Sequence, residues 1–353
     1  MKILMLYTRL AGYWMTCIQE YLSMYGGEFI IVKDKRNPNA SFKFSESDNI
    51  RLYDHDDFTK RELLEFCIQE DPDIIYVVGW TQKDYLMIAR YFFKKGIPVI
   101  CGVDNPWKNT LRQRYGSIYS NLFLTNRFSH IWIPGKPQHE FAKRLGFSSN
   151  QILSGLYSAD FDLFYKEYLK NRTQKSQKFP HRFIYAGRYL ALKGVIDLWN
   201  AFIDFQKETN SDWELWLLGE GELFDSRLIH PKVKHMGFIQ PTEIPEYLSE
   251  TGVFIMPSHY DHWGVAVHEF AAAGYPLICS DNVEAASQFL ENGKNGFLHR
   301  AQDVSSLKKA MIKISRMTDE DLEKMGDISV QKASTITPRD WAAALRSVSE
   351  VTV

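Results

Sequence analysis

The strand–loop–helix–strand pattern of residues 253–280 constrains the fold of this chain more than any other stretch. Val253–Met256 is an apolar run that predicts a buried strand, and Pro257 ends it. Gly264 opens a run of small and apolar residues that predicts a short helix, and Pro276–Ser280 predicts a second buried strand. In a parallel α/β sheet the loop from strand to helix lies at the carboxyl edge, where ligands bind.

The loop between this strand and helix has the features of an anion site. Unpaired N–H groups at a helix start carry partial positive charge, and Gly264 lacks a Cβ, so a ligand can approach the backbone closely. Asp261 precedes the helix and Glu269 lies one turn inside it, so two carboxylates flank the site. A solvated acidic loop followed by an exposed glutamate fits the same residues, and this stretch alone does not decide between the two.

Strand and helix patterns alternate along the whole chain, which predicts parallel βαβ units. A polar stretch rich in Lys and Gln, residues 161–181, interrupts the alternation, which restarts with a strand at 183–186. With 353 residues the chain is long enough for two domains. We therefore predict an α/β fold with two Rossmann-like, doubly wound parallel sheets that face a cleft.

The interruption sets the expected domain limits. We place an N-terminal domain at residues 1–156 and a C-terminal domain at residues 157–335. Within the latter, residues 157–181 are predicted to form a linker region with an exposed helical segment. A final helix is expected within residues 336–353.

Composition excludes several classes of protein. The net charge of −1 gives no indication of a nucleic acid partner, and the four cysteines form no CxxC pair, which argues against a zinc site and fits a reducing cytosol. The chain lacks G-x-G-x-x-G and P-loop motifs and any run of about 18 apolar residues. Near Glu269 lie three histidines whose spacing is not H-E-x-x-H, so we expect no metal; they are His259, His262 and His268.

Positive charge is concentrated between Thr81 and Asn150. This region holds eleven Lys and Arg residues and three Asp and Glu residues, an excess of eight positive charges. A basic face could meet anionic lipid or an anionic acceptor, whereas solvated helix faces would explain the same residues. Peripheral membrane contact through the N-terminal domain therefore stays open.

A second informative stretch is YAGRYLALKG, residues 185–194. Gly187 ends a predicted strand, so Arg188 should emerge at its carboxyl edge, and Lys193 lies at the start of the next helix. Two cations beside helix N–H groups would form a diphosphate clamp that needs no metal and would stabilise a departing diphosphate. The alternative is that Arg188 and Lys193 are ordinary surface residues in a loop between a strand and a helix.

Further loops that follow predicted strands should lie at the carboxyl edge of the sheet in their own domain. Gly219–Gly221 and Gly237–Ile239 follow strands of the C-terminal domain, where glycines also serve tight turns. Together with Arg188 and Asp261 they predict a nucleotide-sized pocket. In the N-terminal domain Asp104–Asn105 end a strand and could bind hydroxyls of an acceptor or form an ordinary turn.

These motifs resemble those of retaining GT-B glycosyltransferases of family 4, mainly over residues 182–298. The family motif is Glu-x7-Glu in a frame like P-S-x-x-E-G-F-G; here Pro257–Ser258 match, Asp261 takes the first acidic place and Glu269 the second. His262–Gly264 replace G-F-G, and the family's A-G-R-x-x-x-x-K-G appears at residues 186–194. Asp is one methylene shorter than Glu, which implies a different donor sugar or weaker activity.

The resemblance implies a nucleotide-diphosphate-sugar donor, UDP- or GDP-linked, with no metal and no other cofactor. Arg188 and Lys193 would grip the diphosphate, Glu269 would accept hydrogen bonds from the ribose, and Asp261 would face the donor sugar. Trp263 would stack on a sugar or pack in the cleft. The remaining implied donor contacts are Gly187, Gly219, Phe238, Ile239, Gly264 and Val265.

The resemblance also implies an acceptor site near Gly12, Asp104 and Asn105, a final helix that crosses back to the N-terminal domain, and retention of anomeric configuration. We expect a hexosyltransferase that builds cell-surface polysaccharide or glycoconjugate on a glycan or lipid-linked acceptor, in the cytoplasm or at the inner face of the membrane. Two alternatives remain: a nucleotide-sugar epimerase and a catalytically silent sugar-nucleotide-binding partner.

Overall fold

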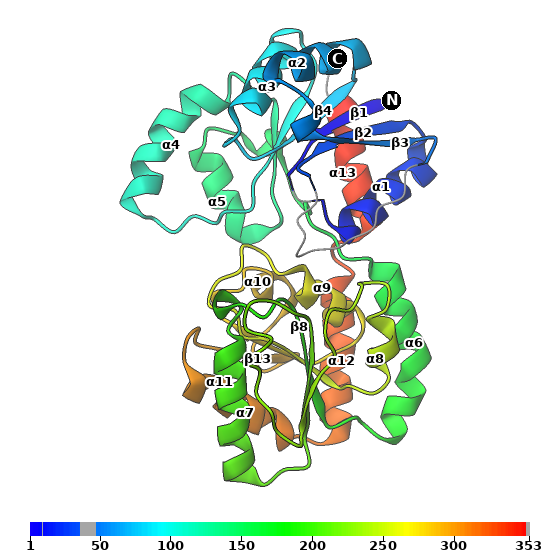
Figure 1. The fold of residues 1–353 in the computed structure, drawn as a ribbon, viewed down its shortest axis with the longest axis vertical. Helices are drawn as coiled ribbons and strands as arrows, with labels where there is room; N and C mark the ends of the chain where they lie inside the picture. The colour runs from blue at the N-terminus through cyan, green and yellow to red at the C-terminus, as the bar shows by residue number, and fades with distance from the viewer. Residues whose placement is uncertain (9, 36–46, 351–353) are drawn as a thin grey trace. The chain divides into compact units, whose positions relative to one another are not determined.

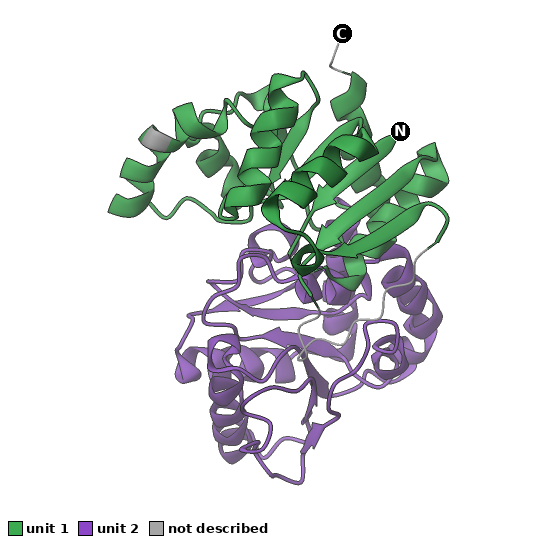
Figure 2. Cartoon of the chain, turned by 45° about the horizontal axis from the view of Figure 1, so that its top comes forward, with its two compact units in different colours: residues 1–158, 336–353 green, residues 159–335 purple. Residues whose placement is uncertain are grey.

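The chain forms two units, each built around one parallel sheet (Figures 1 and 2). The structure is a computed structural model that describes residues 1–8, 10–35 and 47–350, so the last three residues of the predicted 336–353 segment lie outside it. Unit 1 consists of residues 1–158 and 336–353, and unit 2 of residues 159–335.

The sheet of unit 1 has the strand order β3-β2-β1-β4-β5-β6-β7, and every pair is parallel. The central strands are short apolar runs, as expected for a sheet that is covered on both faces, whereas the edge strand at residues 50–54 also carries Arg51 and Asp54. The strands are β1 Lys2–Leu6, β2 Glu28–Lys33, β3 Ile50–Asp54, β4 Ile74–Val78, β5 Val99–Gly102, β6 His130–Trp132 and β7 Ile152–Leu153.

Helices cover both faces of this sheet, because successive side chains of a strand point to opposite sides. Ile3 and Met5 of β1 belong to the core under α1 and α13, whereas Leu4 and Leu6 belong to the core under α2, α3 and α5. A capping box at Thr59 starts α2. The helices are α1 Gly12–Tyr25, α2 Lys60–Glu70, α3 Lys83–Lys94, α4 Leu111–Leu124, α5 Lys136–Arg144 and α13 Pro338–Glu350.

The C-terminal helix α13 packs against α1 and so completes unit 1 (Figure 1). Its Trp341 is fully buried and donates its indole N–H to the carbonyl oxygen of Leu156 at 3.2 Å. The Trp341 ring lies edge-on to Trp14, at 5.4 Å between centroids, and 4.9 Å from Trp132. The expected return of the final helix to the N-terminal domain is confirmed.

Unit 2 repeats the design with the strand order β10-β9-β8-β11-β12-β13, again all parallel. Its strands are β8 Arg182–Ala186, β9 Glu214–Leu218, β10 Val233–His235, β11 Val253–Met256, β12 Leu277–Ser280 and β13 Gly296–His299. Its helices are α6 Phe161–Gln177, α7 Val195–Thr209, α8 Pro245–Leu248, α9 Val265–Ala272, α10 Ala286–Phe289, α11 Val304–Ser315 and α12 Asp319–Ala333. The two predicted doubly wound sheets are thus confirmed.

The polar stretch before β8 is the helix α6, which packs on unit 2. Phe161 and Phe164 are buried, and the hydroxyl of Tyr168 donates to Asp327 of α12 at 2.6 Å. Most of its Lys and Gln side chains lie on the exposed face, whereas Lys175 is buried, with its Nζ 4.0 Å from the centroid of the Tyr275 ring. Among the described residues, none of the helices has the length and apolar character that crossing a membrane requires.

Candidate functional site

The loops that follow β8, β9 and β10 are joined by backbone hydrogen bonds at the carboxyl edge of the unit 2 sheet. The N–H of Gly219 donates to the carbonyl oxygen of Gly237 at 2.6 Å, and the N–H of Tyr189 donates to that of Glu220 at 2.9 Å. Gly219 has φ 136°, and a Cβ there would lie 2.0 Å from the carbonyl oxygen of Gly187. These contacts explain why glycine occupies the predicted donor position 219. At position 187 a Cβ would instead lie 2.8 Å from the Tyr185 hydroxyl.

The loops after β8 and β11 are also in direct contact. The N–H of His259 donates to the carbonyl oxygen of Leu192 at 2.9 Å. Gly194 begins α7 with φ 69°, and a Cβ at this position would lie 2.2 Å from the carbonyl oxygen of Pro257. This close approach fixes the Lys193 segment against the end of β11.

Asn282, which follows β12, holds the β11 loop from the other side. The N–H of Asp261 donates to the carbonyl oxygen of Asn282 at 3.0 Å, and the Asn282 side-chain amide donates to the carbonyl oxygen of His259 at 2.9 Å. Sequence reasoning missed Asn282. Its position two residues beyond a predicted buried strand is the signal that could have found it, because that strand ends at the same sheet edge.

Lys193 and Asp261 form an ion pair, with 2.5 Å between Nζ and Oδ2. Both side chains are mostly buried, with exposed fractions of 22% and 14%. Two residues 68 positions apart are thus brought together by adjacent strands β8 and β11. The ammonium expected to grip a diphosphate is therefore already bound to the carboxylate expected to face the donor sugar.

Arg188 provides positive charge at the same edge. Its side chain is exposed, and no carboxylate of the described residues pairs with it. Its carbonyl oxygen accepts a hydrogen bond from the buried Tyr185 hydroxyl at 2.8 Å, which anchors the backbone at the end of β8. The guanidinium thus stays available for an anion while its backbone is held.

Glu269 lies in the second turn of α9, which begins at Val265 after Gly264 in a left-handed conformation with φ 96°. Its side chain is partly buried. Burial, followed by the negative charge of Asp160, raises the pKa of Glu269 to about 7. The carboxyl group can therefore exist in either protonation state near neutral pH.

Two of the nearby histidines have partners of their own. Nε2 of His259 lies 2.7 Å from the Asp197 carboxylate, and Nδ1 of His262 lies 3.2 Å from the Tyr260 hydroxyl. Over the described ranges, His, Cys, Asp and Glu side chains form no group of three or more that could hold a metal ion.

His268 and Trp263 are packing residues. His268 is fully buried, accepts from the N–H of Ala159 at 3.0 Å through Nδ1 and donates to the carbonyl oxygen of Ala333 at 2.9 Å through Nε2. These partners require the neutral tautomer with the proton on Nε2. Trp263 is also buried, 5.9 Å from Phe289 between ring centroids in an edge-on arrangement, so it packs within unit 2.

Two further predicted donor positions follow β10. Phe238 is exposed and Ile239 is partly buried, so their backbone is near the surface. Both lie in the loop that Gly237 joins to Gly219. The carboxyl edge of the unit 2 sheet thus holds Arg188, the Lys193–Asp261 pair and the glycine loops, and Glu269 lies in the second turn of α9.

The predicted acceptor residues lie in unit 1, on the end of its sheet. Asp104 follows β5 and accepts a hydrogen bond from the Tyr157 hydroxyl at 3.3 Å. The Tyr157 ring packs edge-on against Tyr13, 5.8 Å between centroids, and Gly12 begins the same helix, α1. Asn105 is the next residue after Asp104. Tyr157, which sequence reasoning missed, therefore links the two predicted segments.

A comparison with protein families matches residues 169–331 to the family described as "Glycosyl transferases group 1". This match covers most of unit 2, including every donor-site residue named above.

Curated relatives are similar over part of their length. A glycogen synthase of Mycobacterium tuberculosis is 31% identical over 140 residues, which is 37% of this chain and 33% of that protein. An uncharacterised 41.2 kDa protein of the Klebsiella pneumoniae cps region is 24% identical over 200 residues, 55% of this chain and 54% of that protein. The matches thus span a third to about half of these relatives.

Solved structures are similar over nearly the whole chain. The E. coli trehalose-6-phosphate protein bound with UDP-2-fluoro glucose has a TM-score of 0.75 at 11% identity, and the alignment covers 99% of both chains. The HepE protein of Anabaena in complex with UDP-glucose has a TM-score of 0.70 at 16% identity, covering 99% of this chain and 98% of that one. At these identities the likeness shows the fold alone.

Proposed function

Because the chain belongs to the glycosyl transferases group 1 family, family 4, and has the GT-B fold, we propose that it transfers a hexosyl group from a nucleotide-diphosphate sugar to an acceptor hydroxyl with retention of configuration. The observation that carries the proposal is the convergence of Arg188, Lys193 and Asp261 on one sheet edge within the region that matches the family. We further propose a glycan or lipid-linked acceptor.

Each side chain would act on the donor in a defined way. Arg188 and Lys193 donate to diphosphate oxygens, and their fixed positive charges stabilise the charge that grows on the leaving diphosphate. The ionised form of Glu269 accepts hydrogen bonds from the ribose hydroxyls. Asp261 accepts hydrogen bonds from hydroxyls of the donor sugar once the diphosphate has taken its place at Lys193.

In unit 1, Asp104 and Asn105 would bind the acceptor beside the Gly12 turn. The bond between the anomeric carbon and the diphosphate breaks, and the acceptor oxygen forms a bond to that carbon on the same face. The acceptor proton passes to the leaving phosphate oxygen, so this route needs no nucleophilic carboxylate, unlike that of retaining hydrolases.

The test is release of nucleoside diphosphate from a panel of UDP- and GDP-linked sugars with glycan and lipid acceptors. Lys193→Ala and Glu269→Ala should each lower turnover at least about tenfold, whereas Lys166→Ala, an exposed lysine on α6, should leave it unchanged. If both site variants keep full turnover, the site is wrong. NMR of donor alone detects an epimerase, and tight donor binding without turnover indicates a silent binding protein.

A further inference from the structure

Helix α4 (Leu111–Leu124) carries an exposed apolar stripe. Four of its large apolar side chains are 68–79% exposed. They lie at positions i, i+4, i+7 and i+11, so they line one side of the helix over about 16 Å. The stripe consists of Leu111, Tyr115, Ile118 and Leu122.

The opposite side of α4 holds the helix on unit 1. Ser117 and Leu124 are buried there, so packing does not account for the stripe. Arg112 and Arg114 flank the stripe and are exposed. Contiguous exposed apolar side chains flanked by basic ones are typical of helices that lie in a membrane interface.

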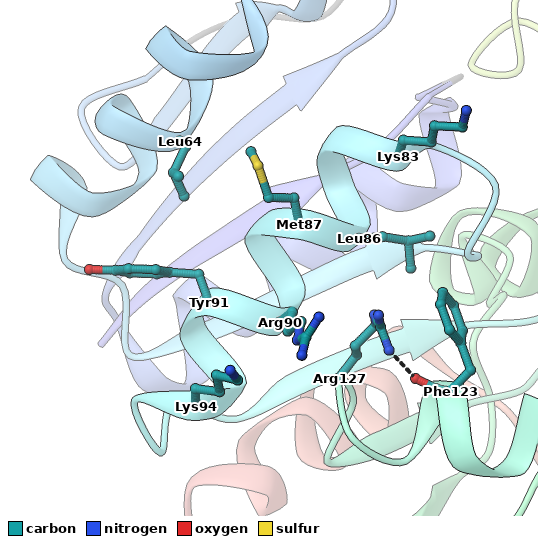
Figure 3. Close-up of a pocket in the computed structure, with 9 residues that line it drawn as sticks. All are labelled: Leu64, Lys83, Leu86, Met87, Arg90, Tyr91, Lys94, Phe123 and Arg127. Atoms are coloured by element: carbon teal, nitrogen blue, oxygen red, sulfur yellow. Dashed lines mark hydrogen bonds between the residues drawn. The ribbon is translucent and has the colours of Figure 1, made fainter.

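Beyond the end of α4 lies a basic pocket of about 500 Å³ (Figure 3). Its floor is apolar and comes from α2, α3 and the end of α4. Arg90, Lys94 and Arg127 line it on one side, and Lys83 lies at the other end of α3. The complete lining is Leu64, Lys83, Leu86, Met87, Arg90, Tyr91, Lys94, Phe123 and Arg127.

The charges of this pocket are not balanced. No carboxylate of the described residues pairs with these four cations, and no acidic residue lines the pocket. Arg127 donates to the carbonyl oxygen of Phe123 at 2.6 Å and lies over the Phe123 ring at 3.7 Å. Burial and the nearby Arg90 charge lower the pKa of Arg127, so an anion here would relieve repulsion.

We propose that the stripe of α4 and the basic pocket together form a docking surface for an anionic lipid membrane. The apolar side chains enter the acyl boundary, and Arg90, Lys94 and Arg127 bind headgroup phosphates. Charge complementarity selects this occupant, because an apolar partner alone would leave the cations without counter-charges. All residues of this surface belong to unit 1, so it shares none with the donor site of unit 2.

The test is co-sedimentation of the full chain with vesicles of phosphatidylcholine, alone or with about a third phosphatidylglycerol, at about 0.1 M salt. The protein should bind the anionic vesicles and not the neutral ones. Ile118→Asp should weaken binding roughly tenfold or more, because it removes an inserted side chain. Arg90→Glu combined with Lys94→Glu should weaken it roughly 25-fold or more, at about fivefold for each charge lost.

Matched controls lie in unit 2. Ile229→Asp changes an isolated isoleucine that is 81% exposed, and Lys166→Glu with Lys309→Glu reverses two exposed cations. Both should bind anionic vesicles like the parent chain, and circular dichroism verifies the fold of every variant. The proposal is overturned by equal binding to neutral vesicles, or by no binding at all.

Two further outcomes identify another occupant and also overturn the proposal. Stabilisation by inorganic phosphate without binding to vesicles would indicate a soluble anion. Self-association in sedimentation velocity that Ile118→Asp abolishes, again without vesicle binding, would indicate a second copy of the chain. Because the assay involves no sugar transfer, its failure is distinct from failure of the proposed function.

Discussion

Glu269 makes the stability of unit 2 depend on pH near neutrality. Its pKa is raised from an ordinary value of 4.5 to about 7, first by burial and then by Asp160. Between these two values the folded chain retains a proton that the unfolded chain has released. Stability should therefore fall as pH rises from about 4.5 to about 7, and the loss is complete above that range.

The size of the effect follows from the same two values. At 1.36 kcal/mol for each pH unit, a pKa raised from 4.5 to about 7 corresponds to about 3 kcal/mol. Because Glu269 is partly exposed, solvent screening reduces this to about 2 kcal/mol. Glu269→Gln removes the ionisation, so the variant should be more stable than the parent at about pH 8 and equally stable at about pH 4.5.

Urea unfolding followed by tryptophan fluorescence at both pH values measures this difference. Glu246→Gln, at an exposed glutamate on α8 of the same unit, is the control and should leave the pH dependence as it is. If the stability difference between Glu269→Gln and the parent is the same at both pH values, folding does not raise the pKa of Glu269, and the prediction is refuted.

Two other predictions concern the fold. Gly194→Ala should cost about 2–4 kcal/mol of stability and lower the melting temperature by about 5–15 °C, because the added Cβ is strained in the left-handed conformation and also clashes with Pro257. Gly293→Ala is the control: its backbone is left-handed too, but no atom lies near the added Cβ, so it should cost only about 1–2 kcal/mol. Equal costs for the two variants would contradict the predicted clash at Pro257. Trp341→Ala should lower the free energy of unfolding in urea by about 3–5 kcal/mol, because its fully buried ring is lost from the core. Arg339→Ala, at an exposed position on the same helix, should lower it by less than about 1 kcal/mol. Equal losses would mean that α13 is not part of the unit 1 core.

Local patterns were sufficient to predict most of the fold. Val253–Met256 and Phe183–Ala186 are uninterrupted apolar runs that end at proline or glycine, and both are parallel strands. Residues 161–181 were harder, because the two buried phenylalanines of α6 stand among many polar residues. Their burial depends on α9 and α12, which the local sequence does not reveal.

The site was predictable as a set of residues at one sheet edge, but not as a set of contacts. The rule that parallel strands end at a common edge brought Arg188 and Asp261 together in the prediction. Whether Trp263 was exposed or buried depended on Phe289, 26 positions later. Likewise, the positive charge of residues 81–150 was visible in the sequence. That Arg90 and Arg127 line the same pocket could not be predicted, because it depends on how the segments that carry them pack.

The ion pair between Lys193 and Asp261 leads to a prediction about donor binding. A diphosphate must compete with the Asp261 carboxylate for the Lys193 ammonium, whose Nζ lies 2.5 Å from it. Asp261→Asn keeps the shape and removes the charge, so it should tighten binding of UDP about fivefold to tenfold, a change of about 1 kcal/mol for a partly screened pair. Lys193→Ala should weaken binding by at least as much.

Isothermal titration with UDP, and with GDP in parallel, measures these affinities. Asp197→Asn, which removes a carboxylate paired with His259 in the same group of loops, is the control for a general change of field. A similar gain in Asp197→Asn would mean that net charge, not competition at Lys193, governs the affinity. If Asp261→Asn instead weakens UDP binding as much as Lys193→Ala, the pair acts as one structural element, because Asp261 is then needed to hold Lys193 in position.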